Sequence, residues 1–294
     1  MSAAMSSQQA ETIHMAASVD DALAALRDHG AQAAPLAGAT WIMRAPIRGE
    51  RLRPAYVGLG AIPELCAVEV ADDEISIGAC VTHARLAAAL HGIRGCQGLV
   101  AAASGAANPA VRQMATVGGN LCTADFPASD LAPALLCLDA SVELCTAAGR
   151  DRVPIGRFLE LRRDLEPATL LTKVTLKRRP LRCAHARLPL RRAGDYPVAI
   201  VSMAAASAGD GSIDDIRIAV GSVEATARRW PELEQRFRGR KLDAAEAEEL
   251  AKAASRAFRG RDGIEAPGWY RVQVLPALVR RCAETIMAPA ETEE

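Results

Sequence analysis

Two short runs of small residues hold the side chains best suited to chemistry in this sequence. They are Leu36-Ala-Gly-Ala-Thr-Trp41 and Thr116-Val-Gly-Gly-Asn120, and each follows an apolar element. Glycine lets the backbone approach a bound group closely and adopt positive φ, so that successive N–H groups can point at an anion. Threonine hydroxyls and the Asn120 amide add uncharged donors. Because a diphosphate needs donors on two sides, the two runs together predict a diphosphate-binding site made of two loops.

Neither run is specific by itself. A Gly-Gly pair is more often a tight turn than a phosphate-binding loop. Neither run has the G-x-G-x-x-G pattern of Rossmann domains or the G-x-x-x-x-G-K-[ST] pattern of P-loops. The sequence therefore does not favour either of those nucleotide-binding folds.

Other patterns that could carry chemistry are missing from the sequence. The five histidines form no H-x-H or H-E-x-x-H pattern, so no metal site is predicted. Ser104-Gly105 lacks the G-x-S-x-G context of an esterase nucleophile. None of the eight cysteines belongs to a C-x-x-C pair, and most lie in apolar runs, which indicates reduced core thiols and no iron–sulfur cluster. No catalytic acid or base is assigned.

The composition excludes several classes of function. The 294 residues contain 35 basic and 35 acidic side chains, and aromatic residues make up 3%. A chain with no excess of positive charge and no aromatic stripe is not expected to bind nucleic acid. No apolar run reaches the roughly 18 residues that a membrane span needs. The N-terminus has no basic segment followed by an apolar one, so we expect no signal peptide and a cytoplasmic protein.

The elements around the two runs can be predicted from caps and periodicity. Residues 1–12 are expected to be a disordered lead-in. A short amphipathic helix starts at the cap Ser18, and a strand of small residues, 33–37, leads into the first run. The second run is expected to lie in a loop between the apolar helix 98–107 and the buried helix 131–138. Further predicted elements are strands at 56–59, 67–70, 75–78 and 141–145, and helices at 41–44 and 82–90.

The character of the sequence changes near residue 178. The basic, proline-broken segment Lys177-Arg-Arg-Pro-Leu-Arg182 is typical of a domain boundary. Strands at 184–190, 198–206 and 213–220 and helices at 243–258 and 272–286 follow it. The sequence thus predicts an α+β chain with a first domain at 13–178. A smaller domain at 179–294 would be a three-stranded antiparallel sheet with helices.

The basic run from Lys177 to Arg192 has more than one interpretation. It is either a solvated face or a docking site. As a docking site it would suit an acidic partner subunit or the diphosphate of NAD, because arginine forks pair with both.

The order and spacing of these segments resemble the FAD subunits of the xanthine dehydrogenase and carbon monoxide dehydrogenase family of molybdenum hydroxylases. Such subunits carry an AGGT-like loop near the N-terminus and a T-[IV]-G-G-N loop further along, here Ala37-Gly-Ala-Thr40 and Thr116-Val-Gly-Gly-Asn120. Further similar segments are Ile62-Pro-Glu-Leu65, Ile77-Gly-Ala79 with Thr82, Pro127-Ala-Ser-Asp130, Pro133-Ala-Leu-Leu136, Leu138-Asp-Ala140 and Gly194-Asp-Tyr196. The similarity covers roughly residues 12–288.

The resemblance implies a two-part FAD-binding domain of the p-cresol methylhydroxylase type, followed by the smaller domain. It implies positions near the ribose for Asp130 and near the isoalloxazine ring for Leu171 and Tyr196. The FAD diphosphate would lie between the two loops, against Leu36, Ala37, Gly38, Ala39, Thr40, Trp41, Thr116, Val117, Gly118, Gly119 and Asn120.

Three features depart from the family pattern. Ala39 replaces the second glycine of the first loop and can restrict the approach of the backbone. Trp41 is bulky where the family often has a small or polar residue. Between Asn120 and Asp130 the chain is one residue longer than usual, at Asp125-Phe126. The effect of these residues on the FAD loop is left open by the sequence.

The function implied by the resemblance is that of the FAD-binding subunit of a heteromeric molybdenum hydroxylase, an FAD-dependent oxidoreductase. In that family electrons pass from iron–sulfur clusters on a partner subunit through FAD to NAD, oxygen, a quinone or another acceptor. The implied partners are a large molybdopterin subunit and a small iron–sulfur subunit, in a dimer of heterotrimers. Two alternatives remain, a stand-alone flavin oxidoreductase of the same fold and a flavin-free scaffold or assembly subunit.

Overall fold

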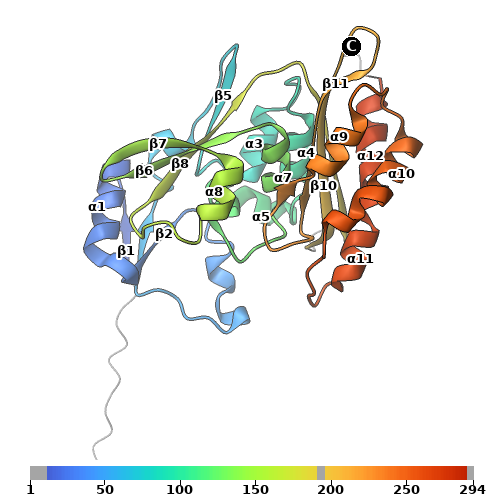
Figure 1. Cartoon of the computed structure of the whole chain (residues 1–294). Helices are drawn as coiled ribbons and strands as arrows, with labels where there is room; N and C mark the ends of the chain where they lie inside the picture. Colours follow the sequence, from blue (N-terminus) through green and yellow to red (C-terminus); the bar gives the residue numbers. More distant parts are fainter. Residues whose placement is uncertain (1–11, 191–195, 290–294) are drawn as a thin grey trace, which may run out of the picture.

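Three β-sheets organise the part of the chain that the computed structural model describes, residues 12–190 and 196–289 (Figure 1). The first sheet is parallel, in the order β1 (Thr12–Met15), β3 (Ala55–Gly58), β2 (Ala33–Leu36). The second is antiparallel, in the order β4 (Val68–Val70), β5 (Glu74–Gly78), β8 (Leu170–Lys177), β6 (Ser141–Thr146), β7 (Gly149–Pro154). The third is also antiparallel, in the order β12 (Arg228–Arg229), β11 (Ile213–Gly221), β10 (Pro197–Ser207), β9 (Arg182–Pro189).

The first sheet and helix α1 (Val19–His29) carry the first run of small residues. The Ser18 hydroxyl accepts a hydrogen bond from the Asp21 N–H at 3.1 Å, and Gly30 ends the helix with φ 52°, as the sequence predicts. The apolar face of α1 packs on β3 and buries Leu23 and Leu26. The chain then returns through β2, which ends at Leu36. The first run therefore leaves the sheet at its carboxyl edge.

Short helices surround the second sheet and hold the second run. They are α2 (Pro63–Cys66), α3 (His83–Ala89), α4 (Gln97–Gly105), α5 (Pro109–Met114), α6 (Val117–Cys122), α7 (Leu131–Cys137) and α8 (Ile155–Leu161). Every residue of α7 is buried, because it lies between the second and third sheets. Its side chains join the largest apolar core of the chain.

The third sheet is covered on both faces. Helices α9 (Pro231–Phe237), α10 (Ala244–Ala254), α11 (Gly268–Gln273) and α12 (Leu275–Met287) lie on one side, and α4 and α7 lie on the other (Figure 1). Nine consecutive residues of β10, from Pro197 to Ala205, are buried. A strand buried on both faces needs a nearly continuous apolar sequence, which β10 has. None of the helices in the described residues is long and apolar enough to cross a membrane.

The predicted α+β fold class is confirmed, and several local expectations change. Thr116–Asn120 is not a loop, because Thr116 caps helix α6 and the other four residues lie in it. The third sheet has a short fourth strand, β12, beside the three that were predicted. Of the expected disordered lead-in, residues 1–11 lie outside the described residues, and Thr12 begins β1. Strands β1, β7 and β8 and helices α2, α5, α8, α9 and α11 were not predicted from the sequence.

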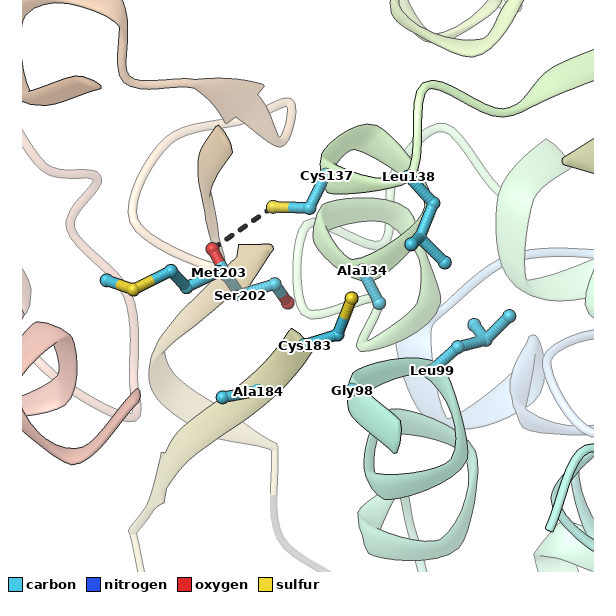
Figure 2. A pocket seen from close by; sticks show the side chains of 9 residues that line it. All are labelled: Gly98, Leu99, Ala134, Cys137, Leu138, Cys183, Ala184, Ser202 and Met203. Atoms are coloured by element: carbon cyan, nitrogen blue, oxygen red, sulfur yellow. Dashed lines mark hydrogen bonds between the residues drawn. The ribbon is translucent and has the colours of Figure 1, made fainter. Parts of the chain in front are cut away.

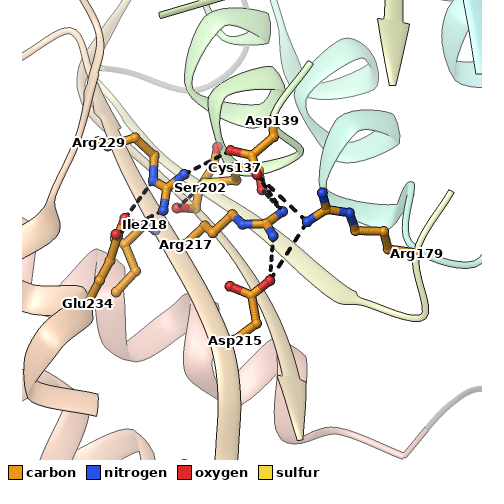
Figure 3. Close-up of polar contacts among 9 residues, drawn as sticks. All are labelled: Cys137, Asp139, Arg179, Ser202, Asp215, Arg217, Ile218, Arg229 and Glu234. Carbon is orange, nitrogen blue, oxygen red and sulfur yellow. Dashed lines mark hydrogen bonds and ion pairs between the residues drawn. The ribbon is translucent and has the colours of Figure 1, made fainter. Parts of the chain in front are cut away.

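A network of charged side chains joins the end of α7 to the third sheet (Figure 3). Asp139, which has φ 47°, accepts from Arg217 of β11 and Arg229 of β12 at 3.1 Å each. Arg217 also pairs with Asp215, and Arg229 also pairs with a glutamate of α9. The Arg217 side chain is only 8% exposed. This network ties the two domains together at the face opposite to α12.

Candidate functional site

The two runs of small residues meet in space at Gly38. A Cβ atom at this position would lie 1.8 Å from the carbonyl oxygen of Met114 and 3.3 Å from the Cα of Ala115. Met114 and Ala115 directly precede Thr116. The first run thus packs backbone to backbone against the start of the second, and only glycine permits this approach.

The first run offers backbone donors. Within the described residues, the N–H groups of Gly38, Ala39 and Thr40 make no hydrogen bond to the protein, while the Ala39 carbonyl accepts from the Met43 N–H at 2.9 Å. Ala39 adopts φ 57°, a left-handed conformation. A left-handed residue inside such a turn is the arrangement in which successive N–H groups form a concave anion site. The departure from glycine at Ala39 therefore does not change the backbone shape expected of this loop.

The second run offers a bare surface and side-chain donors. The N–H groups of Val117 to Asn120 are used within the protein. Gly118 donates to the Ala79 carbonyl at 2.7 Å, and Gly119 donates to the Thr116 hydroxyl oxygen at 3.1 Å. The two glycines differ in role. A Cβ on Gly118 would meet the Ala79 backbone at 2.9 Å, whereas Gly119 is exposed and a Cβ there would meet only Thr116 Oγ1, at 3.0 Å.

Asn120 connects the second run to Asp130. Its side-chain oxygen accepts from the Ser129 hydroxyl at 2.5 Å, so its amide nitrogen, a donor with two hydrogens, has no partner in the described residues. Asp130 follows Ser129 and is 3% exposed. Its Oδ1 accepts from His185 Nε2 at 3.3 Å and from Arg187 Nε at 3.0 Å. Its Oδ2 accepts from no described residue.

Three aromatic rings from separate segments form a cluster beside the first run. The Trp41 and Phe126 ring centroids are 5.3 Å apart, and those of Phe126 and Tyr196 are 5.0 Å apart. Arg48 lies over the Trp41 ring at 3.9 Å, and Arg44 donates to the Tyr196 hydroxyl at 2.5 Å. The bulky Trp41 and the extra segment at Phe126, two of the departures from the family pattern, therefore contact each other.

Leu171 lies apart from these donors. Its side chain is 6% exposed and belongs to the main apolar core, in β8. The next residue, Thr172, accepts from the Ala79 N–H at 2.9 Å, and the Ala79 carbonyl in turn holds Gly118. The structure thus places Leu171 behind the second run, with its side chain directed into the core.

The electrostatics near the site are set by burial. His83 follows the cap residue Thr82, and both of its ring nitrogens are buried without a hydrogen-bond partner among the described residues. Burial lowers the pKa of His83 from 6.5 to about 4; Asp130 opposes this shift, and Arg112 adds to it.

All eight cysteines are free, and burial raises the pKa of Cys80 to about 12. The described residues contain no group of three histidine, cysteine or acidic side chains that could hold a metal.

The basic run is largely used within the chain. Arg178 donates to the Ala71 carbonyl, Arg179 pairs with Asp139, Arg182 donates to the Ala288 carbonyl and Arg187 pairs with Asp130. Arg191 and Arg192 lie outside the described residues. The intramolecular contacts account for most of the run without a docking partner.

Sequence reasoning missed several residues of this region. His185 and Arg187 come from β9, in the other domain, and no sequence pattern connects them with Asp130. Arg44 and Arg48 are four residues apart after the first run, a spacing that could have indicated one cationic face.

Comparison with known proteins identifies the family of this chain. The family described as the FAD binding domain in molybdopterin dehydrogenase matches residues 7–177, more than half of the chain. The chain belongs to this family. The family described as the CO dehydrogenase flavoprotein C-terminal domain matches residues 186–286. This protein is therefore an FAD-binding subunit of the molybdenum hydroxylases and part of an oxidoreductase, with FAD as its cofactor.

Three known proteins are similar to this chain over nearly its full length and nearly the full length of their own chains. The alpha subunit of the 6-hydroxypseudooxynicotine dehydrogenase complex of Paenarthrobacter nicotinovorans is 30% identical over 275 residues, covering 91% of each chain. The carbon monoxide dehydrogenase medium chain of Afipia carboxidovorans is 29% identical and covers 95% of this chain and 97% of its own. A chain of reconstituted CO dehydrogenase from Oligotropha carboxidovorans superposes with TM-score 0.85 at 25% identity, covering 95% of this chain and 98% of that one.

Proposed function

We propose that this subunit binds FAD with the diphosphate between residues 36–41 and 116–120, the ribose beside Asp130 and the isoalloxazine ring near Leu171 and Tyr196. The packing of Gly38 against the Met114 carbonyl carries this proposal, because it brings the first run, whose N–H groups are free among the described residues, against the residues that directly precede Thr116. The chain contributes fixed donors, a close backbone approach and shielding by the aromatic cluster. FAD, when bound, supplies the electron-accepting chemistry that no side chain here provides.

We infer that the chain works as the medium subunit beside a large molybdopterin subunit and a small iron–sulfur subunit, as a dimer of heterotrimers in the cytoplasm. Electrons would reach the flavin from the small subunit and leave to NAD, oxygen, a quinone or another acceptor. The names of the relatives support a multi-subunit assembly. A domain boundary near residue 178 is supported by the two family matches, which end at 177 and begin at 186.

The structure weakens the alternative of a flavin-free scaffold subunit. That alternative requires Ala39 and Trp41 to close the first loop. Ala39 adopts the left-handed conformation, and the Trp41 ring packs against Phe126 and Arg48. Both residues therefore fit a loop whose N–H groups remain free.

The test is Gly119→Val, measured by titration of the full chain with FAD. Because Gly119 is exposed, the added side chain would occupy the space proposed for the diphosphate, and we expect FAD affinity to fall at least about a hundredfold. Gly209→Val is the matched control. It lies in the β10–β11 turn, where an added Cβ meets nothing within 4 Å, and it should leave FAD affinity unchanged. Full affinity in Gly119→Val would remove the second run from the FAD site.

A further inference from the structure

The carboxylate of Asp130 is held from the other domain. Its side chain is 4% exposed, and both side chains that contact it, His185 and Arg187, come from β9. Arg187 also donates to the Gly105 carbonyl at 2.9 Å, at the end of α4. A buried carboxylate needs such partners, since an unpaired buried charge is costly. Two residues that lie 55 and 57 positions after Asp130 in the sequence thus fix one of its oxygens, Oδ1.

His185 is itself fixed from its far side. A carboxylate oxygen only accepts, so His185 Nε2 must be the donor in the contact with Asp130. The other nitrogen, Nδ1, lies 2.8 Å from the hydroxyl of Ser202 in β10. Ser202 is 1% exposed, and the His185 side chain is 2% exposed. The imidazole therefore has a partner on each side and cannot rotate without losing one of them.

Ser202, His185 and Asp130 have the residue types and order of contacts of a hydrolase triad, but no substrate could reach the Ser202 hydroxyl, because Ser202 is buried. Ser202 lines an internal cavity of about 10 Å³ together with Cys137, Cys183 and Met203 (Figure 2). A space of that size admits at most one water molecule. The three side chains can therefore act only on one another and on what contacts Asp130.

We propose that His185, backed by Ser202, is a positioning residue for the FAD ribose. By holding Asp130 Oδ1, His185 and Arg187 leave Oδ2, which accepts from no described residue, to receive the ribose hydroxyls. The third sheet thereby contributes to a site whose other donors lie in the first domain. This inference rests on the proposed function, in which Asp130 contacts the ribose.

The experiment measures FAD affinity of the full chain in His185→Asn and His185→Gln. The Gln side chain can place its amide nitrogen near the position of Nε2, whereas Asn is too short to reach Asp130. We expect His185→Asn to bind FAD about tenfold more weakly, the effect of losing one hydrogen bond to a charged group, and His185→Gln to recover most of the affinity. Ser202→Ala should weaken FAD less than His185→Asn does. His91→Asn, at an exposed histidine, is the control and should have no effect.

A double-mutant cycle with Asp130→Asn separates positioning from general destabilisation. If His185 acts through Asp130, His185→Asn should not weaken FAD further in the Asp130→Asn background. An effect of the same size in both backgrounds, or equal loss in the Asn and Gln variants, would overturn the inference. If Asp130→Asn alone leaves FAD affinity unchanged, the ribose assignment of the proposed function fails instead. If Asp130→Asn weakens FAD and His185→Asn does not, only the role of His185 is lost.

Discussion

At the residue scale, Ala39 holds a backbone conformation that glycine adopts at little cost. Its φ of 57° lies in the left-handed region, and this backbone conformation costs a residue with a Cβ roughly 1–2 kcal/mol. The neighbouring Gly38 tolerates no Cβ at all, because the Met114 carbonyl lies in its place. The first loop therefore keeps glycine where space requires it and uses alanine where only backbone strain is at stake.

Ala39→Gly should raise the free energy of unfolding by about 1 kcal/mol or slightly less. Relief of the left-handed strain exceeds the roughly 0.5–1 kcal/mol that the greater freedom of glycine in the unfolded chain costs. Urea unfolding of the FAD-free chain measures the change. Ala37→Gly, at a residue without positive φ, is the matched control and should lose stability. A loss in Ala39→Gly as large as that in the control would contradict the strain at Ala39.

His83 should make the protein sensitive to acid. Above pH 6.5 the ring is neutral in both states and its contribution to stability is fully present. Between pH 6.5 and about 4 the unfolded chain takes up a proton that the folded chain does not, so stability falls with pH by up to about 3 kcal/mol. Below pH 4 this loss levels off.

The comparison of wild type with His83→Leu isolates that effect, because the variant keeps every other titrating group. Urea unfolding at pH 7 and pH 4.5 should show a smaller drop in the variant. Leucine also removes two buried ring nitrogens that have no partner in the described part of the chain, so the variant need not be less stable at pH 7. Equal drops in both proteins would show that His83 does not titrate as its burial implies.

At the element scale, the sequence predicts the elements that have a clear local signal. Ser18 and Thr82 predict two helix starts, and apolar runs predict α7 and β10. Strand β1 is exposed at all four residues and has no alternating pattern to identify it. Helix α6 contains Gly118 and Gly119, which normally weaken a helix. It forms because the Ala79 carbonyl and the Thr116 cap hold its first N–H groups, and those partners are visible only in three dimensions.

The candidate site was predictable in part, because some of its residues form local sequence patterns and others meet only in the folded structure. Both runs of small residues are continuous in sequence, so their types and spacing indicate the chemistry directly. The contacts around Asp130 join β9 to α7 across the domain boundary, and no local pattern encodes them. In the sequence, Trp41 and Phe126 are visible only as two separate departures from the family pattern. Their contact arises in the folded structure.

At the scale of the whole molecule, side-chain contacts join the FAD-binding domain to the third sheet at the two ends of α7. One junction is the Asp130 cluster at its start, and the other is the ion network around Asp139 after its end (Figure 3). Because α7 is buried between the two sheets, both junctions fix the same helix. The relative position of the domains therefore depends on side chains at the two ends of one element.

Arg217→Ala should lower the free energy of unfolding by about 2 kcal/mol, since it leaves Asp139 and Asp215 without their most buried partner. Chemical denaturation of the FAD-free chain measures this loss. The control is Arg157→Ala, which removes an exposed helical pair with Glu160 and should cost no more than about 0.5 kcal/mol. A loss at Arg217 no larger than that of the control would show that the network around Asp139 does not stabilise the fold.

The most direct test of the account is whether the purified full chain retains FAD. The chain would be incubated with FAD, desalted and examined by visible absorption, and the flavin released on denaturation would be identified. We predict a yellow protein with close to one FAD per chain, released as FAD and not as FMN, because the two runs recognise the diphosphate that FMN lacks. A chain that is colourless alone, and that releases no FAD on denaturation even after assembly with the proposed molybdopterin and iron–sulfur partners, would contradict the proposed site and return the flavin-free scaffold to first place.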